Sequence, residues 1–146
     1  MTSTDKKITA GPLAGTRVLD WTMWQFGPVC SLMLGDMGAD VIKVEGPTFP
    51  DSMRTVGGAR TTPEINISPY FSEYNRGKRS LVIDIKQESG QKALKKLIST
   101  ADVFVENWSS GVAERNELGY KDLTSLNPQI VYVSMPGFGH TGSDAS

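Results

Sequence analysis

A strand–helix–strand pattern with short connections occupies residues 16–45 and restricts the possible folds more than any other feature of the chain. Residues 16–21 (TRVLDW) and residues 41–45 (VIKVE) predict two short buried strands. Between them, Gly27-Pro28 opens a helix, because proline is favoured in the first helical turn, and Gly38 is a natural carboxyl-terminal cap. Strands joined in this way pair in parallel, with a right-handed crossover.

The same alternation returns after an irregular stretch at residues 46–79, which is rich in proline and glycine. Further strands are predicted at residues 80–86, 103–106 and 129–134, and helices after Ser89 and at residues 111–118 and 120–126. Five strands alternating with helices predict an α/β fold with an open, mostly parallel, Rossmann-like doubly wound sheet. We expect residues 1–10 to form a disordered lead-in and residues 11–146 to form one domain.

The charge balance and the hydropathy pattern argue against several classes of partner. Fifteen basic and 16 acidic residues give a net charge of −1, so no general field attracts nucleic acid or an acidic membrane surface. No apolar run approaches the ~20 residues that span a bilayer, and the polar start lacks the apolar core of a signal peptide. We therefore expect a cytoplasmic protein without membrane partners.

Cys30 is the only cysteine, which excludes an internal disulfide and a multi-cysteine zinc site. Its apolar neighbours Val29 and Leu32 predict that Cys30 is a small buried side chain rather than a nucleophile. His140 is the only histidine and has no second metal ligand near it in the sequence. We expect no metal site.

Residues 137–142 (GFGHTG) match the G-x-G-x-x-G spacing of dinucleotide-binding loops. That chemistry requires the glycines to lead into a helix whose amino terminus holds the pyrophosphate, usually after the first strand of the fold. Here the motif follows the last predicted strand, and the turn after the first strand (residues 20–27, DWTMWQFG) lacks the glycine spacing. A nicotinamide-dependent oxidoreductase is therefore a minor alternative.

Five sequence blocks, in a fixed order, are not explained by hydrophobic periodicity. They are PLAGTRVLD at residues 12–20, GADVIKVE at 38–45, NRGKRS at 75–80, ADVFVENW at 101–108, and LNP at 126–128 with the GFG loop at 137–139. This ordered set resembles the amino-terminal region of family III CoA transferases, which include formyl-CoA and carnitine-type CoA transferases and the related 2-methylacyl-CoA racemases. The resemblance runs from about residue 11 to the end.

The resemblance implies that the chain binds coenzyme A through loops at the carboxyl ends of its strands. The residues that match coenzyme A contacts of the family are Trp24, Gln25, Phe26, Lys78, Asn107, Trp108 and Arg115. Cationic and aromatic side chains suit a ligand with several phosphates and an adenine ring. Each residue also has a structural interpretation. In that interpretation Lys78 and Arg115 are solvated surface charges, Asn107 is a helix cap or turn residue, and Trp24 and Trp108 are core aromatics.

The chain departs from the family pattern directly after residue 45. Some relatives carry a coenzyme A-binding arginine there, whereas this sequence continues with Gly46-Pro47. Arg54 and Arg60, in the irregular stretch, are the candidates to replace it.

The resemblance also implies a reaction whose key residue lies outside these 146 residues. In transferases of the family an aspartate attacks an acyl-CoA and becomes a thioester, from which a carboxylic acid takes the coenzyme, and racemases use a histidine and an aspartate. All of these residues lie downstream in the family pattern. We therefore expect an amino-terminal part that is inactive and poorly soluble alone, from an interlocked homodimer acting on acyl-CoA and carboxylic acids. A 2-methylacyl-CoA racemase and a non-catalytic CoA- or nucleotide-binding module are the alternatives.

Overall fold

A computed structural model describes residues 11–55 and 68–145, and the predicted lead-in at residues 1–10 lies outside this part. The strands are β1 (Arg17–Trp21), β2 (Asp40–Glu45), β3 (Arg79–Val82), β4 (Val103–Glu106) and β5 (Val131–Ser134). The helices are α1 (Phe26–Asp36), α2 (Pro69–Asn75), α3 (Glu88–Ile98), α4 (Val112–Arg115) and α5 (Tyr120–Leu126), with one turn of 3-10 helix, η1 (Ser52–Arg54).

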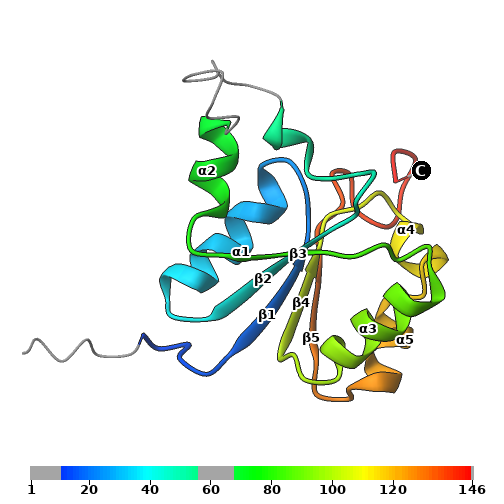
Figure 1. The fold of residues 1–146 in the computed structure, drawn as a ribbon. Helices are drawn as coiled ribbons and strands as arrows, with labels where there is room; N and C mark the ends of the chain where they lie inside the picture. Colours follow the sequence, from blue (N-terminus) through cyan, green and yellow to red (C-terminus); the bar gives the residue numbers. More distant parts are fainter. Residues whose placement is uncertain (1–10, 56–67, 146) are drawn as a thin grey trace, which may run out of the picture.

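The five strands form one sheet with the order β3-β2-β1-β4-β5, and every neighbouring pair is parallel. Helices α1 and α2 lie on one face of the sheet, and α3, α4 and α5 lie on the other (Figure 1). This arrangement confirms the predicted α/β, doubly wound parallel sheet. The chain changes faces between the neighbouring strands β1 and β4, because the helix after β1 covers one face and the helices after β4 cover the other.

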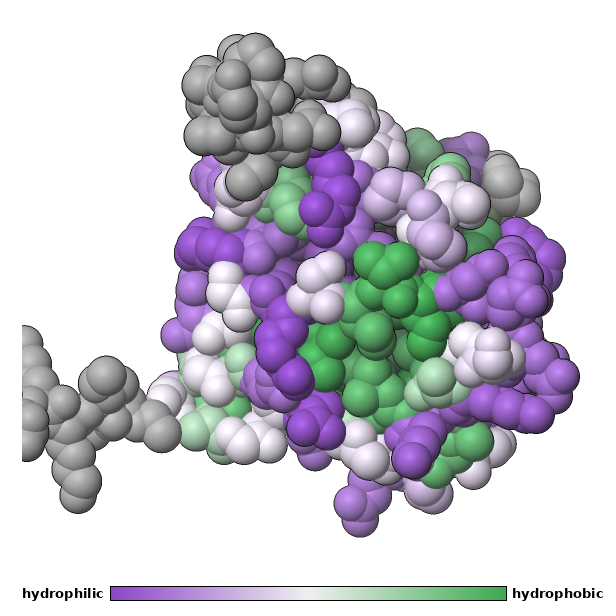
Figure 2. All heavy atoms as spheres, in the orientation of Figure 1, coloured by the Kyte–Doolittle hydropathy of each residue, from purple (hydrophilic) through white to green (hydrophobic). Residues whose placement is uncertain are grey.

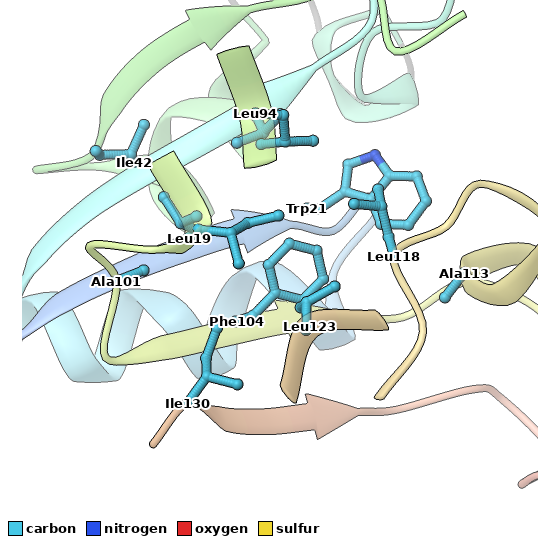
Figure 3. Packing of buried hydrophobic residues seen from close by; sticks show 12 residues of the cluster. Leu19, Trp21, Ile42, Leu94, Ala101, Phe104, Ala113, Leu118, Leu123 and Ile130 are labelled. Atoms are coloured by element: carbon cyan, nitrogen blue, oxygen red, sulfur yellow. The ribbon is translucent and has the colours of Figure 1, made fainter. Parts of the chain in front are cut away.

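The larger hydrophobic core lies between the sheet and helices α3 and α5. Leu19, Phe104, Leu94 and Leu123 are at most 1% exposed and point toward one another from two strands and two helices (Figure 3). The Phe104 ring stacks on Tyr132 with a centroid distance of 5.9 Å. Helix α3 packs on the sheet through the predicted apolar stripe, because burial in this core removes the stripe from water.

Helix α1 contacts the opposite face of the sheet through a smaller cluster centred on Val18, Val41 and Val105. Exposed Phe26 and Met33 of this helix line an apolar groove of about 640 Å³, together with Val29, Cys30, Leu34, Met37 and Met135. Cys30 is only partly buried, which differs from the prediction of a buried side chain: it packs against the Val18, Val41 and Val105 cluster and also borders the groove. Figure 2 shows a second apolar surface, over the edge strand β3 and helix α3.

Element boundaries differ from the predictions mainly where the chain leaves the sheet. The strand predicted at residues 80–86 ends at Val82, and α1 begins at Phe26, two residues before Pro28, which still lies in the first turn. Gly38 follows the α1 cap with a left-handed φ of +101°, as expected for a glycine at this place. Within the irregular stretch at residues 46–79, the described part contains η1 and α2.

Replacing Phe104 by alanine tests the main core. We expect Phe104→Ala to lower the free energy of unfolding by about 3–5 kcal/mol, because a fully buried ring leaves a cavity among strands and helices that cannot collapse. Val82→Ala, on the exposed edge strand, is the control and should change the stability by less than about 0.5 kcal/mol. Chemical denaturation followed by circular dichroism measures both. Equal stabilities of the two variants would contradict this description of the core.

Candidate functional site

The candidate site lies at the carboxyl ends of β1 and β4, where the chain changes faces and where ligands of doubly wound sheets bind. Asn107, directly after β4, donates from Nδ2 to the carbonyl of Met23 and accepts from the N–H of Met23, each at 2.9 Å. The amide thereby joins the loop after β4 to the loop after β1. Gly27 is packed so closely that an added Cβ would lie 2.8 Å from Cγ of Asn107.

Three of the predicted ligand contacts, Trp24, Gln25 and Phe26, project from this loop and the start of α1. Trp24 is 47% exposed and Phe26 is 65% exposed, so the structure does not support the interpretation of Trp24 as a core residue. Trp24 has a left-handed backbone with φ +65°, which is unfavourable for a bulky side chain and is found at ligand-binding turns. Gln25 caps α1 without a side-chain hydrogen bond, so its amide is not used in capping.

Lys78 is not the surface charge that one interpretation predicted. Its side chain is 2% exposed, and Nζ donates to Oδ2 of Asp20 at 2.8 Å and to the carbonyl of Pro28 and Oδ1 of Asn75, each at 2.9 Å. Burial lowers the pKa of Lys78, and the Asp20 carboxylate only partly opposes this effect. A phosphate contact by Lys78 would therefore require the ammonium group to leave three protein acceptors.

Buried carboxylates and cations form a network beneath the same loop. Asp20 is fully buried and accepts from Thr22, Ser31 and Lys78. Burial alone would raise the pKa of Asp20, but the charges of Lys43 and Lys78 and the hydrogen bonds outweigh it and hold the pKa below its ordinary value. The carboxylate therefore stays ionised at neutral pH.

Arg54, a candidate to replace the missing arginine after residue 45, is already engaged within the protein. Nε and Nη2 bind the Glu45 carboxylate at 2.9 and 2.6 Å, and the guanidinium carbon lies 3.8 Å from the centre of the Phe71 ring. Although burial raises the pKa of Glu45, these bonds lower it overall. The other candidate, Arg60, lies outside the described residues.

A pocket of about 250 Å³ opens at the carboxyl ends of β2 and β3. Its wall includes Trp108, whose ring centre lies 5.1 Å from Trp21 and 6.2 Å from Phe49, and whose Nε1 donates to the carbonyl of Trp21 at 2.9 Å. Trp108 is thus both partly a core residue and a pocket wall. Lys86 lines the same pocket, with Nζ donating to Oδ1 of Asn116 at 2.9 Å.

Lys86 was missed in the sequence, although it stands at the end of the strand predicted at residues 80–86, where ligand-binding loops start. It is an exposed residue that lines a hollow with an aromatic wall, in contrast to the enclosed Lys78. Arg115 ends α4 and is exposed, next to Asn116 of the pocket wall.

The predicted contact residues therefore do not all line one cavity: some line the groove along α1, one lines the pocket, and others lie at the start of α1. Gln25 and Phe26 line the apolar groove along α1, and Trp108 lines the pocket. Lys78 and Asn107 line neither, but both contact the first turn of α1, through Pro28 and Gly27 respectively. Gln25, Lys78 and Asn107 therefore meet at the amino end of α1 without sharing one groove.

The glycine motif at residues 137–142 follows the last described strand, whereas dinucleotide-binding loops usually follow the first strand of the fold. Residues 137–142 follow β5, and no helix follows them within the described chain, which extends to residue 145. Nε2 of His140 lies 2.7 Å from the Ser134 hydroxyl.

The described residues contain no group of three or more His, Cys, Asp or Glu side chains that could hold a metal ion. No described helix is long and apolar enough to cross a membrane.

The fold places the chain among Rossmann-like α/β proteins, a class in which ligands bind at the carboxyl ends of the strands. The family model described as CoA-transferase family III matches residues 13–146. The chain therefore belongs to CoA-transferase family III, as its sequence blocks indicated.

Curated relatives and solved structures agree with this assignment. The chain is 42% identical to succinyl-CoA:glutarate CoA-transferase of Homo sapiens and to formyl-CoA:oxalate CoA-transferase of Rhodopseudomonas palustris, over 90% and 87% of its length. A CAIB/BAIF family protein from Brucella suis superposes with a TM-score of 0.83 at 38% identity over 93% of the chain. The chain spans only 29% of each of the two transferases and 36% of the Brucella protein.

The buried carboxylates predict how stability depends on pH. Because the folded pKa values of Asp20 and Glu45 are lowered, their contribution to stability is present above the unfolded values near 4 and is lost as the pH falls through the folded values. We expect the free energy of unfolding to decline below about pH 4. Glu45→Gln should be less stable at pH 7 and should lose less stability on acidification. Urea titrations at several pH values measure this, and an equally steep decline in Glu45→Gln would contradict it.

Proposed function

We propose that this chain is the coenzyme A-binding part of a CoA transferase that moves CoA between an acyl-CoA and a free carboxylic acid. The observation that carries this proposal is the pocket beside Trp108, Phe49 and Lys86 at the carboxyl edge of the sheet, in a chain of this family. The relatives named above are transferases, and this favours CoA transfer over racemisation.

The pocket suits the nucleotide end of coenzyme A. Trp108 and Phe49 offer aromatic surface to the adenine ring, and base–aromatic stacking contributes about 1–3 kcal/mol. Lys86 lines the pocket and is the proposed phosphate partner, and the exposed Arg115, next in sequence to the wall residue Asn116, is proposed as a second one. Trp24, Gln25 and Phe26, at the neighbouring loop, extend the proposed contact surface along the ligand.

The proposed reaction proceeds through a carboxylate nucleophile. An aspartate attacks the acyl-CoA carbonyl, the CoA thiolate leaves, and a mixed anhydride forms. The thiolate then attacks the aspartyl carbonyl, which releases the first carboxylic acid and leaves an enzyme thioester. The acceptor carboxylate attacks this thioester, which expels the CoA thiolate and forms a second mixed anhydride. The thiolate then attacks the acceptor acyl carbonyl of this anhydride, and the aspartate leaves as a free carboxylate while the new acyl-CoA forms.

The carboxylates beneath the site are not suited to this nucleophilic role. Asp20 and Asp51 are at most 2% exposed, and Glu45 is 4% exposed and bound by Arg54 through two nitrogens. A carboxylate that is held by cations and closed off from solvent cannot reach an acyl carbonyl. We propose that the nucleophile lies beyond these 146 residues, in a cytoplasmic, interlocked homodimer that also covers the exposed apolar surfaces.

Titration calorimetry with coenzyme A tests the pocket. We expect Trp108→Ala and Lys86→Ala each to weaken binding about tenfold, because they remove a stacking surface and a phosphate partner. Lys92→Ala is the matched control, since Lys92 is an exposed lysine on α3 paired with Glu88, and it should bind like the unaltered chain. Unchanged affinity in both pocket variants would overturn the assignment of this pocket.

An activity assay tests the proposed position of the nucleophile. We expect the 146-residue chain to bind coenzyme A without transferring it from succinyl-CoA to another carboxylate, because the proposed aspartate is absent. Chromatographic analysis of the acyl-CoA products measures the transfer. Turnover by the 146-residue chain, lost on Asp84→Asn at the pocket wall, would contradict the proposal and identify a carboxylate within this chain.

A further inference from the structure

The backbone between β1 and α1 is held at three consecutive residues by side chains from other parts of the chain. Met23 is held at both its N–H and its carbonyl by Asn107, as described above. On one side of it, the carbonyl of Thr22 accepts from Nζ of Lys43 at 2.9 Å. On the other side, the N–H of Trp24 donates to Oδ1 of Asp51 at 3.0 Å.

Lys43 and Asp51 are themselves a buried ion pair. Their side chains are 2% and 0% exposed, and Nζ lies 2.9 Å from Oδ2. The contact is one of charge rather than an aligned hydrogen bond, since Oδ2 has no hydrogen-bond partner among the described residues. Lys43 comes from β2, whereas Asp51 precedes η1 and is fixed by its own N–H bond to Oε1 of Glu45 at 2.9 Å.

This pair has a geometric consequence for the loop. Trp24 has a left-handed backbone, which a tryptophan adopts only where the surroundings compensate for the strain. The bond from its N–H to Asp51 fixes the residue in that conformation, in which Trp24 is 47% exposed at the edge of the sheet. The Lys43 bond to Thr22 holds the preceding peptide in place.

We propose that Lys43 and Asp51 are positioning residues that fix the Thr22–Trp24 backbone, so that Trp24 and Gln25 are presented to the CoA ligand in one conformation. The inference rests on the proposed function of this edge of the sheet. A loop that is ordered before binding loses less conformational entropy when the ligand arrives, and this increases affinity. Neither Lys43 nor Asp51 needs to touch the ligand for this effect.

Asp51→Ala and Asp51→Asn test the inference, with Asp40→Ala as the matched control. Asp40 is also an aspartate of the β2 region, but it pairs with Arg17 and Arg79 at the other end of the strand. Amide hydrogen exchange reports on the order of the loop, and calorimetry with coenzyme A reports on binding. We expect Asp51→Ala to exchange faster at Met23 and Trp24 and to bind CoA about tenfold more weakly, while amides of Leu19 and Phe104 remain protected.

Asp51→Asn keeps an oxygen acceptor for the Trp24 N–H, so we expect it to restore part of both the protection and the affinity. If Asp51→Ala does not fold, Asp51→Asn alone tests the inference. Weaker CoA binding by Asp51→Asn, with loop amides as protected as in Asp40→Ala, would overturn it. Faster loop exchange with unchanged CoA affinity would overturn it as well. If neither the unaltered chain nor Asp40→Ala binds CoA, the proposed function itself fails, and exchange at Trp24 still reports whether Asp51 orders the loop.

Discussion

The ion network under the carboxyl ends of β1 and β2 is the constraint on which the rest of this site depends. Three acidic residues (Asp20, Glu45 and Asp51) are matched by three cations (Lys43, Arg54 and Lys78), so the network is neutral. Charges removed from water are tolerated only when each has partners, and loss of one partner from a buried pair costs about 3–5 kcal/mol. The loops after β1 and β2 are thereby tied to the sheet and to each other.

A parallel sheet makes such an arrangement possible at one edge only. All five strands end on the same side, so the residues after β1, β2, β3 and β4 converge there, although they are far apart in the sequence. At the point between β1 and β4 the helices leave to opposite faces, and the Asn107 amide joins the two loops there. The resulting edge has buried ion pairs beneath and exposed aromatic side chains above, which suits the nucleotide that we propose to bind there.

The sequence predicted the fold well because each strand carries its signal locally. Runs such as VIKVE and VFVE, each followed by turn residues, identify β2 and β4 without knowledge of their neighbours. The environment of Lys78 is different, since its main partner, Asp20, is 58 positions away, and nothing near Lys78 in the sequence indicates burial. Lys86 was overlooked for the related reason that its pocket is completed by Trp108 and Asn116, which come from other elements. Periodicity reveals which face of an element is buried, but not which lysine is enclosed and which lines a pocket.

The choice of tryptophan at position 24 links the network to the proposed ligand. Glycine adopts a left-handed backbone without strain, whereas a residue with a side chain loses roughly 1–2 kcal/mol there. If the turn served only to connect β1 to α1, glycine would be the more stable choice, and the exposed indole adds little packing in return. The presence of a tryptophan in this strained conformation is explained if its exposed ring contacts the proposed ligand. The buried ion network therefore stabilises the backbone conformation that places the Trp24 ring at the surface, where the ligand is proposed to bind.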